Sequence, residues 1–215
     1  MMQIKGFVFN PFFENTYVVW DETLECVIID PGCLERHEKE ELKEFIDSKE
    51  LKPVRLLNTH SHLDHVFGND FVHKTWGLTP ELHPSDERVY VSYANTASIY
   101  GFHHADPLPE PSYNLEEGQT ISFGQSKLDI LFLPGHCPGH VAFLSQEQKF
   151  MISGDVLFQG SIGRTDLPGG DMQTLLDSIQ TKVLPLEDDV VVYSGHGPET
   201  TVGQERRTNP FLNFQ

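Results

Sequence analysis

The seven-residue stretch Thr59–His65, which reads THSHLDH, constrains the fold of this chain more than any other segment. It places three imidazoles and one carboxylate within six residues. Residues 53–58 before it form a short apolar run that predicts a buried strand, and residues 66–71 after it can begin a helix. The motif therefore lies at the end of a strand, where side chains from several segments can converge in a cleft.

The residue types in this motif point to metal binding, because imidazole and carboxylate are the usual protein ligands of zinc, iron and manganese. His60 and His62 are two residues apart, so they face the same side of an extended segment. Asp64 and His65 are adjacent and diverge, which suits a second metal ion rather than the first. A surface histidine cluster is the alternative, and a single His-x-His pair would favour it. Four ligand-type residues in this order favour the metal site.

Three further ligand candidates repeat the same arrangement later in the chain. His136, Asp155 and His196 each follow a glycine directly, and each glycine follows shortly after an apolar run. The pattern predicts strands that deliver a ligand at their ends, as in the first motif.

These segments together resemble the metallo-β-lactamase superfamily and, within it, the glyoxalase II-like hydrolases. The matching stretches are THSHLDH at 59–65, PGHCPGH at 134–140, SGD at 153–155, GSIGRTD at 160–166 and SGHG at 194–197. They occur in the family order and span most of the chain, and they are more specific for the superfamily than for a substrate. The resemblance implies an αββα sandwich with metals at one edge between the sheets. The segment pattern alone predicts only a mixed α/β chain.

The chain reads as one domain over residues 1–215, without an internal repeat or a low-complexity linker. Strands are expected at 3–9, 16–20, 26–29, 53–58, 78–83, 121–123, 127–133, 140–145, 150–153 and 190–193. Helices are expected at 35–49, 64–76, 84–98, 171–183 and 203–208. Residues 100–111 contain three prolines and a glycine, so a loop is expected there, and loops of this length often cover sites.

The charge of the chain disfavours some classes of partner. With 15 basic and 32 acidic residues the formal net charge is −17, which repels phosphate backbones, so we expect no nucleic-acid partner. No basic amphipathic stretch suggests a membrane surface, and no apolar run is long enough to span a bilayer. The expected partner is a small molecule.

The cysteines and the N-terminal residues indicate a cytoplasmic location. The chain has three cysteines, an odd number, and they are widely spaced: Cys26, Cys33 and Cys137. This argues against a disulfide framework and fits a reducing compartment. The first residues, MMQIK, show no apolar core of a signal peptide. Cys137 follows His136 and could lie near a metal, but consecutive residues diverge, so we favour a small buried filler.

Matched motif by motif, the resemblance implies seven ligands to two divalent ions, with zinc first and iron or manganese as alternatives. They are His60, His62 and His136 for one ion, Asp64, His65 and His196 for the second, and Asp155 as the bridge. Two such ions share one water and lower its pKa toward neutrality, which gives a hydroxide nucleophile. They also polarise a carbonyl and stabilise its oxyanion. Asp64, which can orient the hydroxide, and Asp155 are the predicted catalytic residues.

The resemblance favours thioester hydrolysis as in glyoxalase II, with a substrate such as S-lactoylglutathione. Arg164 lies where family members place a cation for glutathione, and an arginine can hold a carboxylate in a bidentate fork. Its alternative role is to tie down its own loop, for example through Asp166. The chain ends soon after His196, as in the short relatives that lack the C-terminal helical domain of full-length glyoxalase II, so glutathione use stays open.

Several side chains near the motifs have two interpretations. Asp30 either supports the metal site from behind, as an acidic residue does in the resembling family, or serves only the Asp-Pro-Gly turn. His140 either packs or supports a ligand. We expect His103 and His104 to be surface residues, because the ligand set is complete without them; His37, His73 and His83 are read the same way.

Other activities share parts of this ligand set. A persulfide dioxygenase of the same superfamily would use one iron on the equivalents of His60, His136 and Asp155, and a lactonase would fit all seven ligands. A β-lactamase is disfavoured because Asp155 is a bridging type of carboxylate and no export signal is visible. A non-catalytic metal-binding module would need closed coordination, against which a seven-ligand dinuclear set argues.

Overall fold

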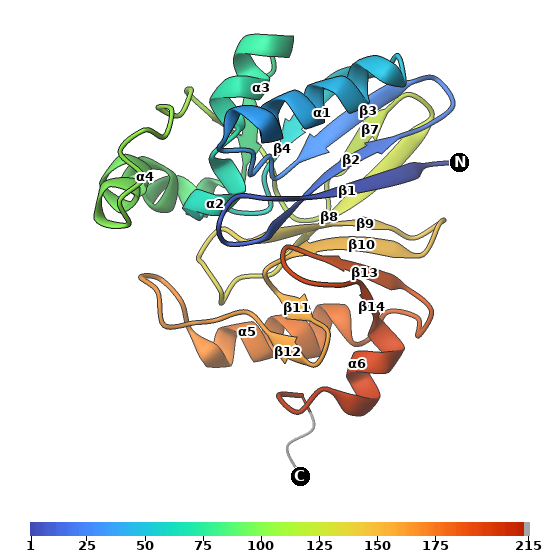
Figure 1. The fold of residues 1–215 in the computed structure, drawn as a ribbon. Coiled ribbons are helices and arrows are strands. Elements are labelled where there is room, and N and C mark those ends of the chain that lie inside the picture. Colours follow the sequence, from blue (N-terminus) through green and yellow to red (C-terminus); the bar gives the residue numbers. More distant parts are fainter. Residues whose placement is uncertain (213–215) are drawn as a thin grey trace. The chain divides into compact units, whose positions relative to one another are not determined.

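The computed structural model describes residues 1–212, and these fold as two compact units (Figure 1). The first unit comprises residues 1–114 together with 122–127, and the second comprises 115–121 and the chain from 128 onward. One domain over residues 1–215 stays a prediction, and its last three residues lie outside the described part.

The first unit is built on a six-stranded sheet with the strands in chain order. They are β1 (Gln3–Phe9), β2 (Glu14–Trp20), β3 (Glu25–Ile29), β4 (Lys52–Leu57), β5 (Pro80–Leu82) and β6 (Ser112–Tyr113). The first three run antiparallel, and β3 to β6 run parallel. All seven residues of β2 are buried, although the strand starts with the polar residues Glu14 and Asn15.

Helix α1 (Arg36–Ser48) lies along this sheet (Figure 1). Leu42 and Ile46, one helical turn apart, pack into an apolar cluster with Leu56 of β4. Burying each such side chain contributes about 1.5–3 kcal/mol. The helix begins with a capping box in which the Glu35 side chain and the Glu38 side chain each accept from the other's backbone.

The predicted helix over residues 64–76 is interrupted, which corrects the sequence expectation. The structure contains a single turn, α2 (Leu63–Val66), and then α3 (Asn69–Trp76), which ends at the predicted residue with Gly77 as its cap. The backbone N–H of Gly68 donates to the carbonyl of Pro31 at 2.7 Å, a partner far along the chain. A Cβ on residue 68 would lie 2.4 Å from Cys33 Sγ, so the close approach requires glycine.

The remaining part of the first unit follows the predicted order. The expected helix at 84–98 is a short 3₁₀ turn (Pro84–Asp86) followed by α4 (Glu87–Ile99). Tyr90 and Tyr93 of α4 donate to carbonyls of Pro109 and Asp106 at 2.7 and 3.2 Å, so the proline-rich loop is held against this helix.

The second unit contains another six-stranded sheet, in the order β14-β13-β10-β9-β8-β7. Its strands are β7 (Thr120–Phe123), β8 (Ser126–Phe132), β9 (Val141–Ser145), β10 (Phe150–Gly154), β13 (Val191–Ser194) and β14 (Thr200–Thr201). Strand β10 is parallel to β13. Strand β9 is antiparallel to both of its neighbours, β8 and β10. The tip of the β7–β8 hairpin, residues 122–127, belongs to the first unit.

Two helices cover this sheet: α5 (Met172–Ser178), continued by a π turn (Ile179–Val183), and α6 (Val202–Thr208) (Figure 1). Leu175, Ile179 and Val202 pack in one apolar cluster with Met151 and Val192 of the central strands. A small hairpin of β11 (Leu157–Phe158) and β12 (Ser161–Ile162), which the sequence did not predict, follows β10.

The ligand candidates follow strand ends as predicted: Asp155 comes directly after β10, and His196 two residues after β13. The predicted mixed α/β class, with sheets flanked by helices, is confirmed. No helix within residues 1–212 combines the length and the apolar composition that crossing a bilayer requires.

Candidate metal centre

In the first unit the structure brings together all four ligand candidates of the THSHLDH motif. The ring centroids of His60 and His62 lie 4.8 Å apart, and those of His60 and His65 lie 4.1 Å apart. Asp64 Oδ2 lies 3.7 Å from His65 Nε2. His60 and His62 come from the extended segment before α2, and Asp64 and His65 come from the single turn of α2. Because that turn begins directly after His62, all four side chains reach the same place.

Asp30 supports this cluster, which decides between its two interpretations. Its Oδ1 accepts from the Thr59 N–H at 2.7 Å. Its Oδ2 accepts from the Thr59 hydroxyl at 2.6 Å and lies 3.2 Å from His65 Nδ1. Because a carboxylate oxygen accepts, His65 donates from Nδ1 and keeps its Nε2 lone pair for a metal. Asp30, His60 and His65 are close enough to hold an ion themselves. We assign Asp30 as an orienting residue because its oxygens already accept these bonds.

Glu14, which sequence reasoning missed, lies behind the same histidine. The side chain is fully buried, with Oε1 4.0 Å from His65 Nδ1 and Oε2 accepting from the Thr16 hydroxyl at 2.9 Å. Burial raises the pKa of Glu14 well above its ordinary value, the nearby Asp30 and Asp64 raise it further, and His65 lowers it. An acidic residue in a strand whose seven residues are all buried is the feature that marks Glu14.

In the second unit the three later candidates converge on one atom. His136 Nε2 lies 3.6 Å from Asp155 Oδ2, and His196 Nε2 lies 3.5 Å from the same oxygen. His136 is 2% exposed in its side chain, whereas His196 is 27% exposed. A carboxylate oxygen this close to two imidazole nitrogens can serve with them as a metal ligand.

Mostly backbone groups hold this second set. His136 Nδ1 donates to the carbonyl of Arg164 at 2.7 Å, which leaves Nε2 as its ligand atom. The Asp155 N–H donates to His140 Nε2 at 3.0 Å, so His140 has the supporting role. A Cβ on Gly163 would lie 1.9 Å from the Asp155 carbonyl oxygen, so the loop passes directly against this ligand.

The Arg164 side chain is paired within its own loop. Its Nε and one terminal nitrogen donate to the two Asp166 carboxylate oxygens at 2.7 and 2.8 Å. That hydrogen bond lowers the pKa of Asp166 to about 2. Both side chains are more than half exposed. This is the loop-tying arrangement; substrate binding by Arg164 stays a prediction.

His73 and His104 have local partners outside the two ligand sets, and His37 and His103 are exposed. His104 lies 3.2 Å from Glu35 and is 61% exposed, as expected of a surface residue. His73 Nδ1 donates to the Leu78 carbonyl at 2.8 Å. Cys137 is fully buried, consistent with a filler.

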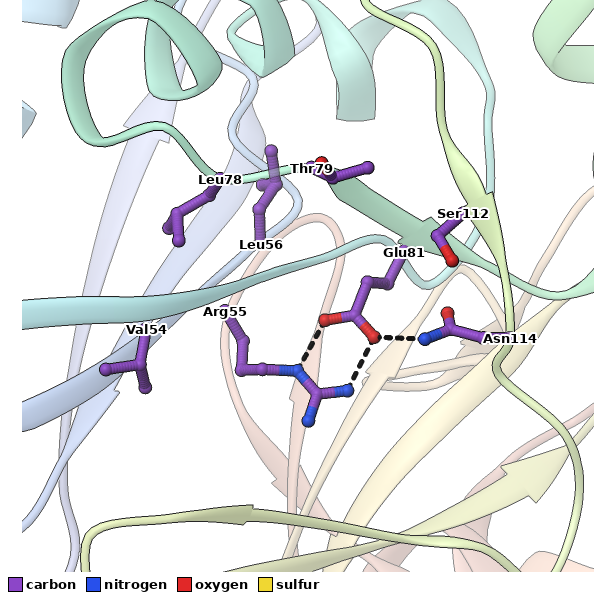
Figure 2. A pocket seen from close by; sticks show the side chains of 8 residues that line it. All are labelled: Val54, Arg55, Leu56, Leu78, Thr79, Glu81, Ser112 and Asn114. Atoms are coloured by element: carbon purple, nitrogen blue, oxygen red, sulfur yellow. Dashed lines mark hydrogen bonds and ion pairs between the residues drawn. The ribbon is translucent and has the colours of Figure 1, made fainter.

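The first unit also contains a pocket of about 580 Å³, and none of the ligand candidates lines it (Figure 2). Arg55 of β4 forms a bidentate pair with Glu81 of β5, and Asn114 Nδ2 donates to the same carboxylate at 2.7 Å. The pair neutralises its own charge and links neighbouring parallel strands. No histidine or cysteine is among its lining residues, which are Val54, Arg55, Leu56, Leu78, Thr79, Glu81, Ser112 and Asn114.

The donor atoms fit a divalent metal. In His65 and His136 the Nδ1 atom is held by a protein acceptor, and His60 Nδ1 lies 3.0 Å from the Thr59 hydroxyl. In these three rings Nε2 is the remaining nitrogen donor, and a carboxylate lies close to His65, His136 and His196. Nitrogen and oxygen donors of this kind suit zinc, iron or manganese alike.

Comparison with known proteins gives concordant matches. Residues 9–196 match the family model described as the metallo-beta-lactamase superfamily. The chain is 41% identical over 218 residues to "Hydroxyacylglutathione hydrolase GloC" of Haemophilus influenzae, with 99% of each chain covered. It superposes with a TM-score of 0.88 and 37% identity on the BLEG-1 B3 metallo-beta-lactamase, covering 99% of this chain and 100% of that one. It also superposes with a TM-score of 0.87 and 39% identity on TTHA1623 in a di-iron-bound form, covering 97% of this chain and 100% of that one.

Proposed function

Because the chain belongs to the metallo-β-lactamase superfamily, we propose that its two ligand sets form one dinuclear metal centre for hydrolysis. His60, His62 and His136 would hold one ion, Asp64, His65 and His196 would hold the second, and Asp155 would be shared by both. The shared position of Asp155 Oδ2, 3.6 Å from His136 Nε2 and 3.5 Å from His196 Nε2, is the observation that carries this proposal. A carboxylate placed between ligands of two ions can be shared by both, and the metal stoichiometry tests whether it is.

Two divalent ions, when bound, would supply a water that ionises near neutral pH and a Lewis acid for a carbonyl oxygen. The chain's own residues keep the imidazole rings in place through Asp30, Thr59 and the Arg164 carbonyl. Asp64 is the ligand that also orients the attacking water.

Two of the three cysteines are unsuited to act as a thiol nucleophile. Burial raises the pKa of Cys26 to about 12 and raises that of Cys33 further above its ordinary value. Both thiols are fully buried in the first unit. Neither therefore offers a thiolate to a substrate at neutral pH.

The substrate we propose is a thioester of the hydroxyacylglutathione kind, and zinc is the first candidate metal. The 41% identical relative over nearly the full chain carries that enzyme's name. We further propose that Arg164 leaves Asp166 to bind a carboxylate of the thiol carrier. A cytoplasmic location stays a prediction, which cell fractionation would check.

The test is a substrate panel run on protein whose metal content has been measured. It contains S-lactoylglutathione, an acyl thioester without glutathione, a lactone, a β-lactam, and glutathione persulfide with an oxygen electrode. We expect close to two ions per chain and the highest kcat/KM on S-lactoylglutathione. One iron per chain with oxygen uptake would replace this function by persulfide oxidation, and preferred turnover of the β-lactam or the lactone would replace the substrate.

In the same panel, Arg164→Ala should lower kcat/KM for the glutathione thioester about 10- to 150-fold, the loss expected for one charge-assisted hydrogen bond. The effect should appear mainly in KM and should spare the small thioester, because the carrier is remote from the reacting carbonyl. Equal losses on both substrates would make Arg164 a loop residue only.

A further inference from the structure

Two buried asparagines hold the backbone of two consecutive ligands in the first unit. Asn10 Nδ2 donates to the carbonyl of Asp64 at 3.0 Å, and Asn58 Nδ2 donates to the carbonyl of His65 at 3.1 Å. We propose that Asn10 and Asn58 are positioning residues that set the Asp64–His65 ligand pair for the second metal ion. This rests on the ligand assignment of the proposed function.

The Asp64 carbonyl needs such a partner because the helix around it is interrupted. In a continuous helix the N–H of Gly68 would donate to the carbonyl four residues earlier, which is that of Asp64. Here the Gly68 N–H donates to Pro31 instead, and α2 ends at Val66. A buried carbonyl left without a donor is unfavourable, so the Asn10 amide takes the place of the missing helical bond.

Asn10 is suited to this task because of its place in the chain. It follows β1 with φ of 53°, a left-handed conformation that asparagine tolerates better than most residues. Its amide also donates to the Gly32 carbonyl at 3.0 Å, and its backbone N–H donates to Glu38 Oε1 at 2.6 Å. One residue thus ties the start of α1 and the loop after Asp30 to the ligand turn.

Asn58 precedes the motif directly and is oriented by a second amide. Asn69 Nδ2 donates to Asn58 Oδ1 at 2.9 Å, which turns the Asn58 NH₂ group toward the His65 carbonyl. The Asn58 N–H donates to the Glu81 carbonyl at 3.0 Å, so its backbone is fixed to β5. Both asparagines of this pair are fully buried.

The two amides act on two consecutive ligands only. They fix the peptide groups of Asp64 and His65, whereas His60 and His62 belong to the extended segment before α2. Losing either amide should therefore weaken the second ion selectively. The expected loss is about 10- to 100-fold in affinity, the range for partners that orient metal ligands.

The experiment uses three variants of the full chain and one control. Asn10→Asp keeps the turn and the acceptor for the Phe12 N–H but replaces both donors by an acceptor. Asn10→Gly keeps the left-handed backbone and removes the amide alone. Asn58→Ala removes the amide that donates to the His65 carbonyl. Asn114→Ala, which loses an asparagine bond to Glu81 in the same unit, is the matched control.

Each metal-free protein is titrated with Co²⁺ while its absorption spectrum is recorded, and its melting temperature is measured. We expect the second equivalent to bind about tenfold or more weakly in the three variants, with an altered visible band, while the first equivalent and the Asn114→Ala titration match the parent.

Unchanged binding of both equivalents in folded Asn10→Gly and Asn58→Ala, with only a lower melting temperature, would overturn the positioning role. Equal weakening of both equivalents would overturn it as well. If Asn10→Asp does not fold, the other two variants decide. A parent that binds only one ion would instead remove the proposed function, so the two failures are separate.

Discussion

The two units hold their predicted ligands by different means. In the first unit, side chains far apart in the sequence brace a compact motif: Asp30 holds Thr59 and His65, and asparagine amides hold the carbonyls of Asp64 and His65. In the second unit, ligands from three separate strand ends are braced mainly by main chain, above all the Arg164 carbonyl and the close passage of Gly163.

The difference follows from how the ligands are delivered. A motif that presents neighbouring residues to one metal site cannot continue as a regular strand or helix. Its peptide groups therefore lack regular hydrogen-bond partners, and side chains from elsewhere supply them. A ligand at the end of a paired strand has its backbone already fixed by the sheet. The first unit should consequently be sensitive to side-chain identity, and the second to changes that displace the loop.

The largest effect should come from the ligand that both ions would share. Asp155→Ala removes the oxygen on which His136 and His196 converge, so bound metal should fall and kcat should drop by at least about 10²- to 10³-fold. Elemental analysis and steady-state kinetics measure both. His104→Ala is the control, because that side chain is 61% exposed. Metal loss from the control would show that the ligand set is misassigned.

The next effect tests the side-chain brace of the first unit. Asp30→Ala leaves the Thr59 N–H, the Thr59 hydroxyl and His65 Nδ1 without their acceptor, so metal affinity should fall about 10- to 100-fold. Chelator competition measures the affinity. Its counterpart is Arg164→Ala, which keeps the carbonyl that holds His136, so its metal affinity should stay within about twofold. Similar losses in both variants would remove the contrast between the units.

Gly163→Ala tests the main-chain brace of the second unit. The added Cβ would stand 1.9 Å from the Asp155 carbonyl oxygen, so the loop must move, at a destabilisation of about 1–3 kcal/mol. Denaturant unfolding and metal titration together should show lower stability and weaker metal binding. Gly160→Ala has free space and only a φ of 69° to oppose it, so it should reduce stability without reducing metal affinity.

The smallest effect concerns a first-unit carboxylate away from the ligands. Burial alone would raise the pKa of Asp21, but hydrogen bonds from Thr23, Gln125 and Ser126 lower it to about 2. A carboxyl group with a lowered pKa in the folded state stabilises it above the ordinary value of about 3.9, and the contribution is lost as pH falls toward 2. It amounts to about 2 kcal/mol.

Asp21→Asn should therefore lower the free energy of unfolding at neutral pH and flatten its decline between pH 4 and 2, which chemical denaturation at several pH values measures. An unchanged slope would mean that the hairpin tip at 122–127 is not held by this carboxylate.

Most elements could be predicted from the sequence because their signals are local. The apolar runs around β1 and β4, and the spacing of Leu42 and Ile46 in α1, lie within one element each. The interruption of the helix at Gly68 could not be predicted, since its cause is the Pro31 carbonyl. The ligand candidates could be recognised for the same reason, because each is a histidine or an aspartate that follows a predicted strand directly or shortly after in the sequence.

Asp30 and His140 were among the supports considered from the sequence, but the other braces escaped prediction because they depend on contacts across the chain. Glu14 and Asn10 lie 51 and 54 residues before the ligands His65 and Asp64 that they approach. The support of His136 by a backbone carbonyl leaves no trace in residue type at position 164, where the side chain instead drew attention. Residue chemistry therefore predicts ligands better than it predicts what orients them.

The central claim is that the ligands of the two units serve one pair of metal ions. The most direct test is electron paramagnetic resonance of the parent protein titrated with Mn²⁺. Two ions bridged by Asp155 at about 3.5–4 Å should give an exchange-coupled spectrum as the second equivalent binds, and Asp155→Ala should abolish it. Two equivalents with only the spectrum of isolated Mn²⁺, or saturation at one ion, would contradict the claim.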